Sequence, residues 1–209
     1  MHQQTTIYYR SDIINILIKS FNYSSYLEIG VDDPALNFDK IDCIIKQGID
    51  PNSLRRDILK TTSDDYFKGL KDKFDLIFID GLHHCQQVLR DIKNSLKHLN
   101  QNGTIVCHDM LPSNVIMQLV PRLSNIWTGD CWKAWGHLRM TRQNLSMFVI
   151  NTDYGIGVIK KGFQKLYVPR ISMAKMDYSF FYSNKKDLMN ILTISEFIEL
   201  FDKSATYNV

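Results

Sequence analysis

Apolar and polar positions alternate along the first part of the chain in a way that predicts short buried strands separated by helices. Runs of mostly apolar or β-branched residues predict strands over 26–30, 44–49, 74–80 and 104–109. Apolar positions with helical spacing predict helices over 11–21, 64–71 and 84–99. Strands that alternate with helices in this manner favour a parallel sheet with helices on both of its faces.

The later part of the chain has a different pattern. Two apolar runs, 148–153 and 157–161, flank Tyr154-Gly155 and predict an antiparallel hairpin. Asn100–Gly103 reads as a turn, and residues 110–146 read as irregular or helical. We therefore predict an α/β fold: a Rossmann-like, mostly parallel sheet with helices on both faces and an antiparallel C-terminal hairpin.

We expect one α/β domain over residues 1–162, including the N-terminal helix. Residues 163–209 form a C-terminal extension with a helix near 195–201, and we expect it to pack on the same domain as a cap or a dimer surface. The extension is rich in aromatic residues, among them Tyr178, Phe180, Phe181 and Tyr182. An exposed aromatic patch of that size is unusual on a monomer, so a homodimer is one possible assembly.

Composition narrows the class of protein. The chain has 209 residues and a net charge of +3 from 25 basic and 22 acidic residues, which is too even to predict nucleic-acid binding. It has no apolar run long enough to span a membrane and no secretory signal at its N-terminus. The four cysteines show no CxxC spacing, so we expect reduced thiols in a cytoplasmic protein rather than a zinc site.

Titratable side chains follow two of the predicted strands. Asp80 ends the first strand and is followed by Gly81, His83 and His84, whereas His108 and Asp109 end the second. One helix separates the two strands, so their carboxyl ends should lie close together and present chemistry at one edge of the sheet. This pairing makes an enzyme the leading hypothesis.

The residues after the first two strands indicate a nucleoside ligand. Gly30 lets the backbone approach a ligand closely, and Asp50 can accept hydrogen bonds from both ribose hydroxyls. The loop lacks GxGxxG, and Asp32 and Asp33 would repel a pyrophosphate but tolerate a positively charged nucleoside cofactor. The alternative is that Gly30 and Asp50 are only turn residues.

Three further groups each have two interpretations. Ser63 and Asp64 either reach an adenine or belong to an ordinary helix N-terminus. Asp80, His108 and Asp109 either bind Mg²⁺ or another divalent ion, or Asp80 bonds substrate or cofactor while the other two cap a turn. The Trp132, Lys133 and Trp135 segment either walls a sugar-sized pocket or anchors a helix on the sheet.

Together these motifs resemble the class I S-adenosylmethionine-dependent methyltransferases. The resemblance rests on Tyr26–Val31, Gly48–Pro51, Thr62–Asp64, Phe74–His83 and Gly103–Asp109. It implies that Glu28 and Gly30 lie along the methionine moiety of the cofactor, that Asp50 holds the ribose, and that Ser63 and Asp64 border the adenine.

The Phe-Ile-Asp-Gly-x-His form is similar to small bacterial methyltransferases of surface-glycan and secondary-metabolite pathways, and sugar O-methyltransferases of the macrolide and aminocoumarin type look related. That likeness implies a divalent ion between Asp80 and an acidic pair whose first acid is replaced here by His108. We predict O-methylation of a small polar acceptor, a sugar or glycan precursor, with Asp80, His83, His108 and Asp109 as catalytic residues. His83 is the preferred general base and Asp80 the alternative. A non-catalytic nucleoside-binding domain and a metal-dependent hydrolase are the competing hypotheses.

Overall fold

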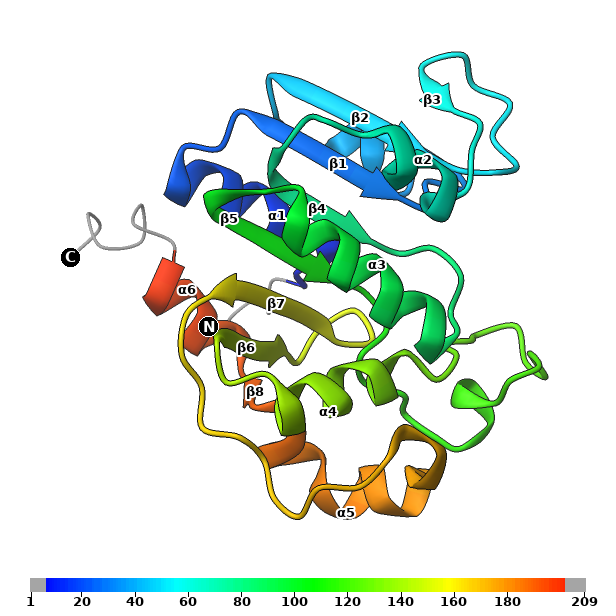
Figure 1. Ribbon diagram of the computed structural model, residues 1–209, viewed down its shortest axis with the longest axis vertical. Helices are drawn as coiled ribbons and strands as arrows, with labels where there is room; N and C mark the ends of the chain where they lie inside the picture. Colours follow the sequence, from blue (N-terminus) through cyan, green and yellow to red (C-terminus); the bar gives the residue numbers. More distant parts are fainter. Residues whose placement is uncertain (1–6, 202–209) are drawn as a thin grey trace, which may run out of the picture.

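The computed structural model of the chain describes residues 7–201, and the strands within that range form one sheet. The strands are β1 Ser25–Ile29, β2 Ile45–Ile49, β3 Ile58–Leu59, β4 Phe74–Ile79, β5 Leu99–Cys107, β6 Leu145–Ile150, β7 Ile156–Lys161 and β8 Ile191–Leu192. Their order across the sheet is β3-β2-β1-β4-β5-β7-β6-β8 (Figure 1). Among the strands of residues 7–201, only β7 runs against its neighbours, so the predicted mostly parallel sheet with an antiparallel hairpin is confirmed.

Helices cover both faces of the sheet, as predicted. They are α1 Arg10–Phe21, α2 Ser63–Gly69, α3 Cys85–Lys97, α4 Cys131–Thr141, α5 Tyr178–Met189 and α6 Ile194–Phe201, with single 3₁₀ turns η1 Phe38–Lys40, η2 Ile116–Gln118 and η3 Met173–Lys175. In Figure 1, α3 and α4 lie in front of the sheet and α1 lies behind it. Alternation along β4 explains the two layers, since Leu76 and Phe78 pack with α1 whereas Ile77 and Ile79 pack with α3 and α4.

One local prediction was wrong. Asn100–Gly103 is not a turn but the first part of β5, which begins at Leu99, directly after α3. Leu99 pairs with Phe74, and the register then shifts before Thr104 pairs with Leu76. The Asn100 amide donates to Asp75 at 2.7 Å, so a cross-strand bond stabilises a segment whose composition indicates a turn.

The C-terminal segment joins the same sheet, because β8 pairs in parallel with β6. Helix α4 packs against α5, and its Trp132 and Trp135 side chains are fully buried, so these tryptophans anchor a helix and do not line a pocket. A Cβ atom at Gly157 would lie 2.4 Å from the Trp135 ring, which shows how closely α4 sits on β7. No helix within residues 7–201 is long and apolar enough to cross a membrane.

Candidate active site

The main cavity opens at the carboxyl ends of β1, β2, β4 and β5 and has a volume of about 830 Å³. The predicted site residues that line it are Glu28, Gly30, Asp50, Ser63, Asp64, Asp80, His83, His108 and Asp109. The structure therefore brings together the whole predicted set from loops that are distant in sequence. His84 does not line the cavity and instead occupies the N-cap position of α3, as expected for a residue that starts the helix.

Glu28 and Gly30 form the end of β1 in this cavity. Gly30 has φ +83°, and a Cβ atom there would lie 2.4 Å from the Asp80 carbonyl oxygen, so the close approach is to the end of β4. The Glu28 carboxylate is 1% exposed and accepts bonds from the Tyr26 hydroxyl at 2.5 Å and the Asn37 amide at 2.9 Å. Burial raises the pKa of Glu28 from 4.5 to about 7, which places a group of variable charge beneath the ligand space.

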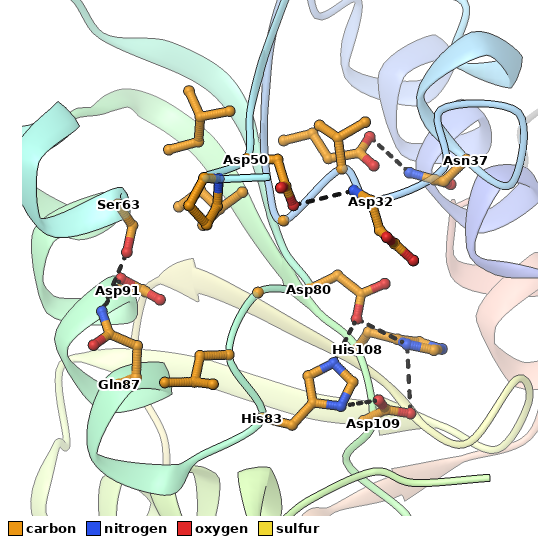
Figure 2. Close-up of a pocket in the computed structure, with 18 of the residues that line it drawn as sticks. Asp32, Asn37, Asp50, Ser63, Asp80, His83, Gln87, Asp91, His108 and Asp109 are labelled. Carbon is orange, nitrogen blue, oxygen red and sulfur yellow. Dashed lines mark hydrogen bonds and ion pairs between the residues drawn. The ribbon is translucent and has the colours of Figure 1, made fainter. Parts of the chain in front are cut away.

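Asp50 follows β2 and is held by the backbone around it. Its Oδ2 accepts from the Asp32 N–H at 3.2 Å and its Oδ1 from the Asn52 N–H at 2.7 Å (Figure 2). Asp32 itself adopts a left-handed conformation, with φ 45°. Each carboxylate oxygen of Asp50 keeps a further acceptor position, so the side chain is oriented and still able to bind a diol.

Ser63 and Asp64 begin α2 and face α3 rather than capping their own helix. The cap is Thr62, whose Oγ1 accepts from the Asp65 N–H at 3.2 Å. The Gln87 amide nitrogen of α3 lies 3.1 Å from Ser63 Oγ, 3.3 Å from Asp64 Oδ1 and 3.0 Å from Asp91 Oδ1. Sequence reasoning missed Gln87 and Asp91, although two polar residues one turn apart on an amphipathic helix were the available signal.

Asp91 is the most unusual member of that group. Its side chain lines the cavity, yet the residue is only 1% exposed. Burial raises the pKa of Asp91 to about 6 and outweighs the hydrogen bonds from Ser63 and Gln87, which lower it.

Two carboxylates and two imidazoles form a closed, alternating ring at the ends of β4 and β5. His83 Nε2 lies 3.4 Å from Asp80 Oδ1, and His83 Nδ1 lies 3.2 Å from Asp109 Oδ2. His108 Nδ1 closes the ring at 3.2 Å from Asp80 Oδ1 and 3.4 Å from Asp109 Oδ1. Figure 2 shows dashed lines from both imidazoles to Asp80 and to Asp109. Asp109 adopts a left-handed conformation with φ 63°, a strained backbone of the kind that concentrates at functional sites.

Within this ring the pKa values of the two carboxyl groups shift in opposite directions. Burial opposes ionisation of Asp80, but His108, His83 and Arg10 outweigh burial and hold the pKa of Asp80 below its usual range. Burial, with the Asp80 charge added, raises the pKa of Asp109 to about 6. Burial disfavours charge on both imidazoles, yet the carboxylates outweigh it, raising the pKa of His83 and bringing the pKa of His108 to about 10.

Two further residues contact the ring and were not predicted. Asp153, at the tip of the β6–β7 hairpin with φ 42°, places its carbonyl oxygen 2.8 Å from His108 Nε2. Arg10, the first residue of α1, places its Nη1 3.2 Å from Asp80 Oδ2. The contacts span 45 and 70 residues, so local patterns carried no signal for either residue.

An aromatic wall lies beside His83. The Trp127 ring stacks on the His83 ring with centroids 5.2 Å apart and an interplanar angle of 25°, and its Nε1 donates to the Leu119 carbonyl at 2.6 Å. The Arg122 guanidinium lies 5.8 Å from the Trp127 ring, and Asn125 and Ile126 complete this side of the cavity. Trp127, rather than the predicted Trp132 or Trp135, is therefore the tryptophan of the pocket.

A divalent ion has three possible ligand atoms here, from Asp80, His83 and Asp109, all within 4.8 Å of one another. The contacts do not fit an ion, however. The two nitrogens of His83 each face a different carboxylate rather than a position shared by both. The other oxygen of Asp80 is paired with Arg10. The expected set of Asp80, His108 and Asp109 stays a prediction, and no step below depends on a metal.

Comparison with known proteins finds a methyltransferase domain and solved structures of the same fold. Residues 38–110 match a family model described as a methyltransferase domain. The methyltransferase PaMTH1 from Podospora anserina, solved with S-adenosylhomocysteine, is 16% identical, with a TM-score of 0.54 over 75% of this chain and 78% of that chain. An O-methyltransferase from Bacillus cereus, also in complex with S-adenosylhomocysteine, is 14% identical, with a TM-score of 0.54 over 76% of this chain and 84% of that chain.

A third solved structure has the same fold. TomG from Streptomyces achromogenes, an O-methyltransferase of tomaymycin synthesis in complex with S-adenosylmethionine, is 11% identical, with a TM-score of 0.52 over 73% of this chain and 79% of that chain. No curated protein sequence matches the chain significantly. The chain therefore has the fold of these methyltransferases, and its residues 38–110 match a methyltransferase domain, in agreement with the family that its motifs resemble. The metal-dependent hydrolase hypothesis has no support from these matches.

Proposed function

We propose that this protein transfers a methyl group from S-adenosylmethionine to a hydroxyl of a small polar acceptor, with a sugar as the leading acceptor. The observation that carries the proposal is the position of His83. Its imidazole lies between Asp80 and Asp109 and stacks on Trp127, where the predicted cofactor residues meet the aromatic wall. A base at this junction can reach a hydroxyl held against the wall.

The cofactor half of the cavity suits a positively charged nucleoside. Asp50 is oriented to accept hydrogen bonds from ribose hydroxyls. Ser63 and Asp64, at the start of α2, line the part of the cavity that we assign to the adenine. Glu28 lies beneath the position expected for the methionine moiety, where an approaching ammonium group would favour its ionised form against the burial that raises its pKa. When bound, S-adenosylmethionine would supply an electrophilic methyl group on a cationic sulfur.

The protein residues have two tasks in the transfer. They align the acceptor oxygen with the methyl carbon, because the reaction proceeds in line, and they accept the proton that the hydroxyl loses. We propose that His83 accepts the proton of the acceptor hydroxyl while the bond between the acceptor oxygen and the methyl carbon forms and the bond between that carbon and sulfur breaks. Asp109 on Nδ1 orients the ring and stabilises the imidazolium that results, and Nε2, whose contact with Asp80 is the longer at 3.4 Å, exchanges Asp80 for the acceptor hydroxyl to take the proton. Asp80 as the base itself is less favourable, since its lowered pKa makes it a weak base.

The acceptor half of the cavity suits a sugar. The face of a sugar ring packs well on an aromatic side chain, and Trp127 provides one beside His83. Asn125 and Arg122 provide polar groups on the same side. A surface-glycan or secondary-metabolite precursor made in the cytoplasm is the acceptor we expect, and the four free thiols suit that compartment.

An aromatic hydroxyl is the second candidate acceptor. Ile126 lines the cavity next to Trp127 and is 55% exposed, so an apolar ring would also find a contact there. The two acceptor classes differ in their need for Asn125 and Arg122, since an aromatic ring has few groups for them to bind.

The test begins with calorimetric titration of the purified chain with S-adenosylhomocysteine. Methyl-tritiated S-adenosylmethionine is then offered with a panel of sugars, nucleotide-linked sugars and catechols. We expect labelled product with one acceptor class, its loss in His83→Gln and its retention in His84→Gln, because the neighbouring imidazole does not line the cavity. Cofactor binding with no product across the panel would instead support the non-catalytic hypothesis, and absence of cofactor binding would refute the proposal.

A further inference from the structure

Arg10 reaches the candidate active site from α1, which packs on the face of the sheet opposite to α3 and α4 (Figure 1). It is the first residue of α1, and its side chain, 21% exposed, lines the main cavity. Its backbone N–H donates to Asp153 Oδ2 at 3.0 Å, which holds the start of the helix against the hairpin tip. Its Nη1 then reaches Asp80 Oδ2 at 3.2 Å, so one residue connects α1, β4 and the β6–β7 hairpin.

The same guanidinium covers His108. Nη1 lies 2.8 Å from Nδ1 and 3.0 Å from Nε2 of His108. An atom nearly equidistant from both ring nitrogens lies off the plane of the ring, so Nη1 is not directed along the lone pair of either nitrogen. Both nitrogens of His108 already face oxygens, Nδ1 toward Asp80 and Nε2 toward the Asp153 carbonyl. His108 therefore has no nitrogen directed at an empty position.

We propose that Arg10 is the built-in cation of this site: it pairs with Asp80, keeps divalent ions away from Asp80 and Asp109, and positions Asp80 against His83. A guanidinium is always charged in proteins, and it supplies directional donors to a carboxylate. With Oδ2 of Asp80 paired to Arg10, Oδ1 is the oxygen that faces both imidazoles, at 3.4 Å from His83 and 3.2 Å from His108. The proposal deepens the proposed function, because the residue that Arg10 positions contacts the proposed base.

Removal of Arg10 should convert the cluster into a metal site. Without the guanidinium, Asp80 Oδ2 loses its cation, and Asp109 and His83 lie close enough to supply further ligand atoms. A nitrogen ligand among carboxylates favours Mn²⁺ over Mg²⁺, so Mn²⁺ is the more sensitive probe. A residue with a purely structural role would change stability without creating such an affinity.

The experiment is a Mn²⁺ titration of the full chain, followed by calorimetry and by the electron paramagnetic resonance signal of free Mn²⁺. The wild-type protein, Arg10→Lys and the surface control Arg55→Ala should show no saturable binding at millimolar Mn²⁺. Arg55 pairs with Asp39 in an exposed position far from the cluster in sequence, so its removal tests the loss of an arginine–aspartate pair as such. Arg10→Ala should bind one Mn²⁺ per chain, and Asp109→Asn added to Arg10→Ala should remove that binding.

Two results would overturn the proposal: saturable Mn²⁺ binding by the wild type that Asp109→Asn abolishes, or no binding by a folded Arg10→Ala. Circular dichroism establishes folding, and Arg10→Gln replaces Arg10→Ala if the alanine variant does not fold. S-adenosylhomocysteine titration of the same samples separates the two proposals. If the wild type does not bind S-adenosylhomocysteine, the proposed methyltransferase function is refuted. The Mn²⁺ titration tests the role of Arg10 independently of that result.

Discussion

Glu28 permits a quantitative prediction about stability. The carboxyl is 1% exposed at the end of β1, and burial raises its pKa from 4.5 to about 7. An acid whose pKa is raised in the folded state stabilises the fold below its unfolded pKa, and that contribution is lost as the pH rises through the folded value. The folded protein should therefore lose stability through Glu28 between pH 4.5 and about pH 7.

The structure also sets the size of the effect. One pKa unit corresponds to about 1.4 kcal/mol, so the interval from 4.5 to about 7 corresponds to about 3 kcal/mol of unfolding free energy. Glu28→Gln removes the ionisation but keeps an oxygen that can accept from Tyr26 and Asn37. The glutamine variant should consequently gain stability over the wild type as the pH rises, by about 3 kcal/mol in total.

The assay is urea denaturation of both proteins, followed by tryptophan fluorescence from about pH 5 to about pH 8. Other groups also titrate in this range, so the measured quantity is the difference in unfolding free energy between Glu28→Gln and the wild type at each pH. Glu199→Gln is the matched control, because the same chemical change is made on an exposed residue of α6. A difference that stays constant with pH would refute the raised pKa and the role of burial at Glu28.

The remaining predictions concern binding and catalysis. His83→Gln should reduce methyl transfer by about 10²–10⁴-fold with an unchanged S-adenosylhomocysteine affinity, because it removes the base and leaves the nucleoside residues. The wild-type rate should rise with pH through the raised pKa of His83, since only neutral imidazole accepts a proton, and Asp80→Asn should move this limb to lower pH. Asp50→Ala should weaken S-adenosylhomocysteine binding by about 10–100-fold through lost charged hydrogen bonds. Trp127→Leu should raise the acceptor KM by about tenfold and leave cofactor affinity unchanged.

For each of these predictions, a specific result would contradict it. Equal loss of cofactor binding and turnover in His83→Gln would indicate a structural role for the imidazole. A rate that falls with rising pH would exclude neutral His83 as the base. Tight binding by Asp50→Ala would assign the ribose elsewhere, and a changed cofactor affinity in Trp127→Leu would place the aromatic wall in the nucleoside half.

Strand and helix patterns predicted the elements between 26 and 109 because the signals there are local. The predicted strands there contain short apolar runs, and Asp50, Asp80 and His108 each follow a strand immediately, whereas the two-residue strand β3 was not predicted. Parallel strands carry their carboxyl ends to one edge, so strand order alone brings Asp50, Asp80 and Asp109 to one cavity. Local composition misled where a long-range contact outweighed it, as at Asn100, which bonds Asp75 across the strands instead of turning.

Three features of the site depend on tertiary packing. Arg10 reaches Asp80 only because α1 packs behind the sheet, and Asp153 reaches His108 only because β7 of the hairpin pairs with β5. Trp127 stacks on His83 from an irregular segment. None of these residues lies in a periodic pattern that points to the cavity. The candidate cofactor residues and the candidate base could accordingly be predicted from the sequence. The cation beside them and the acceptor wall emerge only when distant segments meet, because a side chain's partner is set by three-dimensional distance rather than by spacing along the chain.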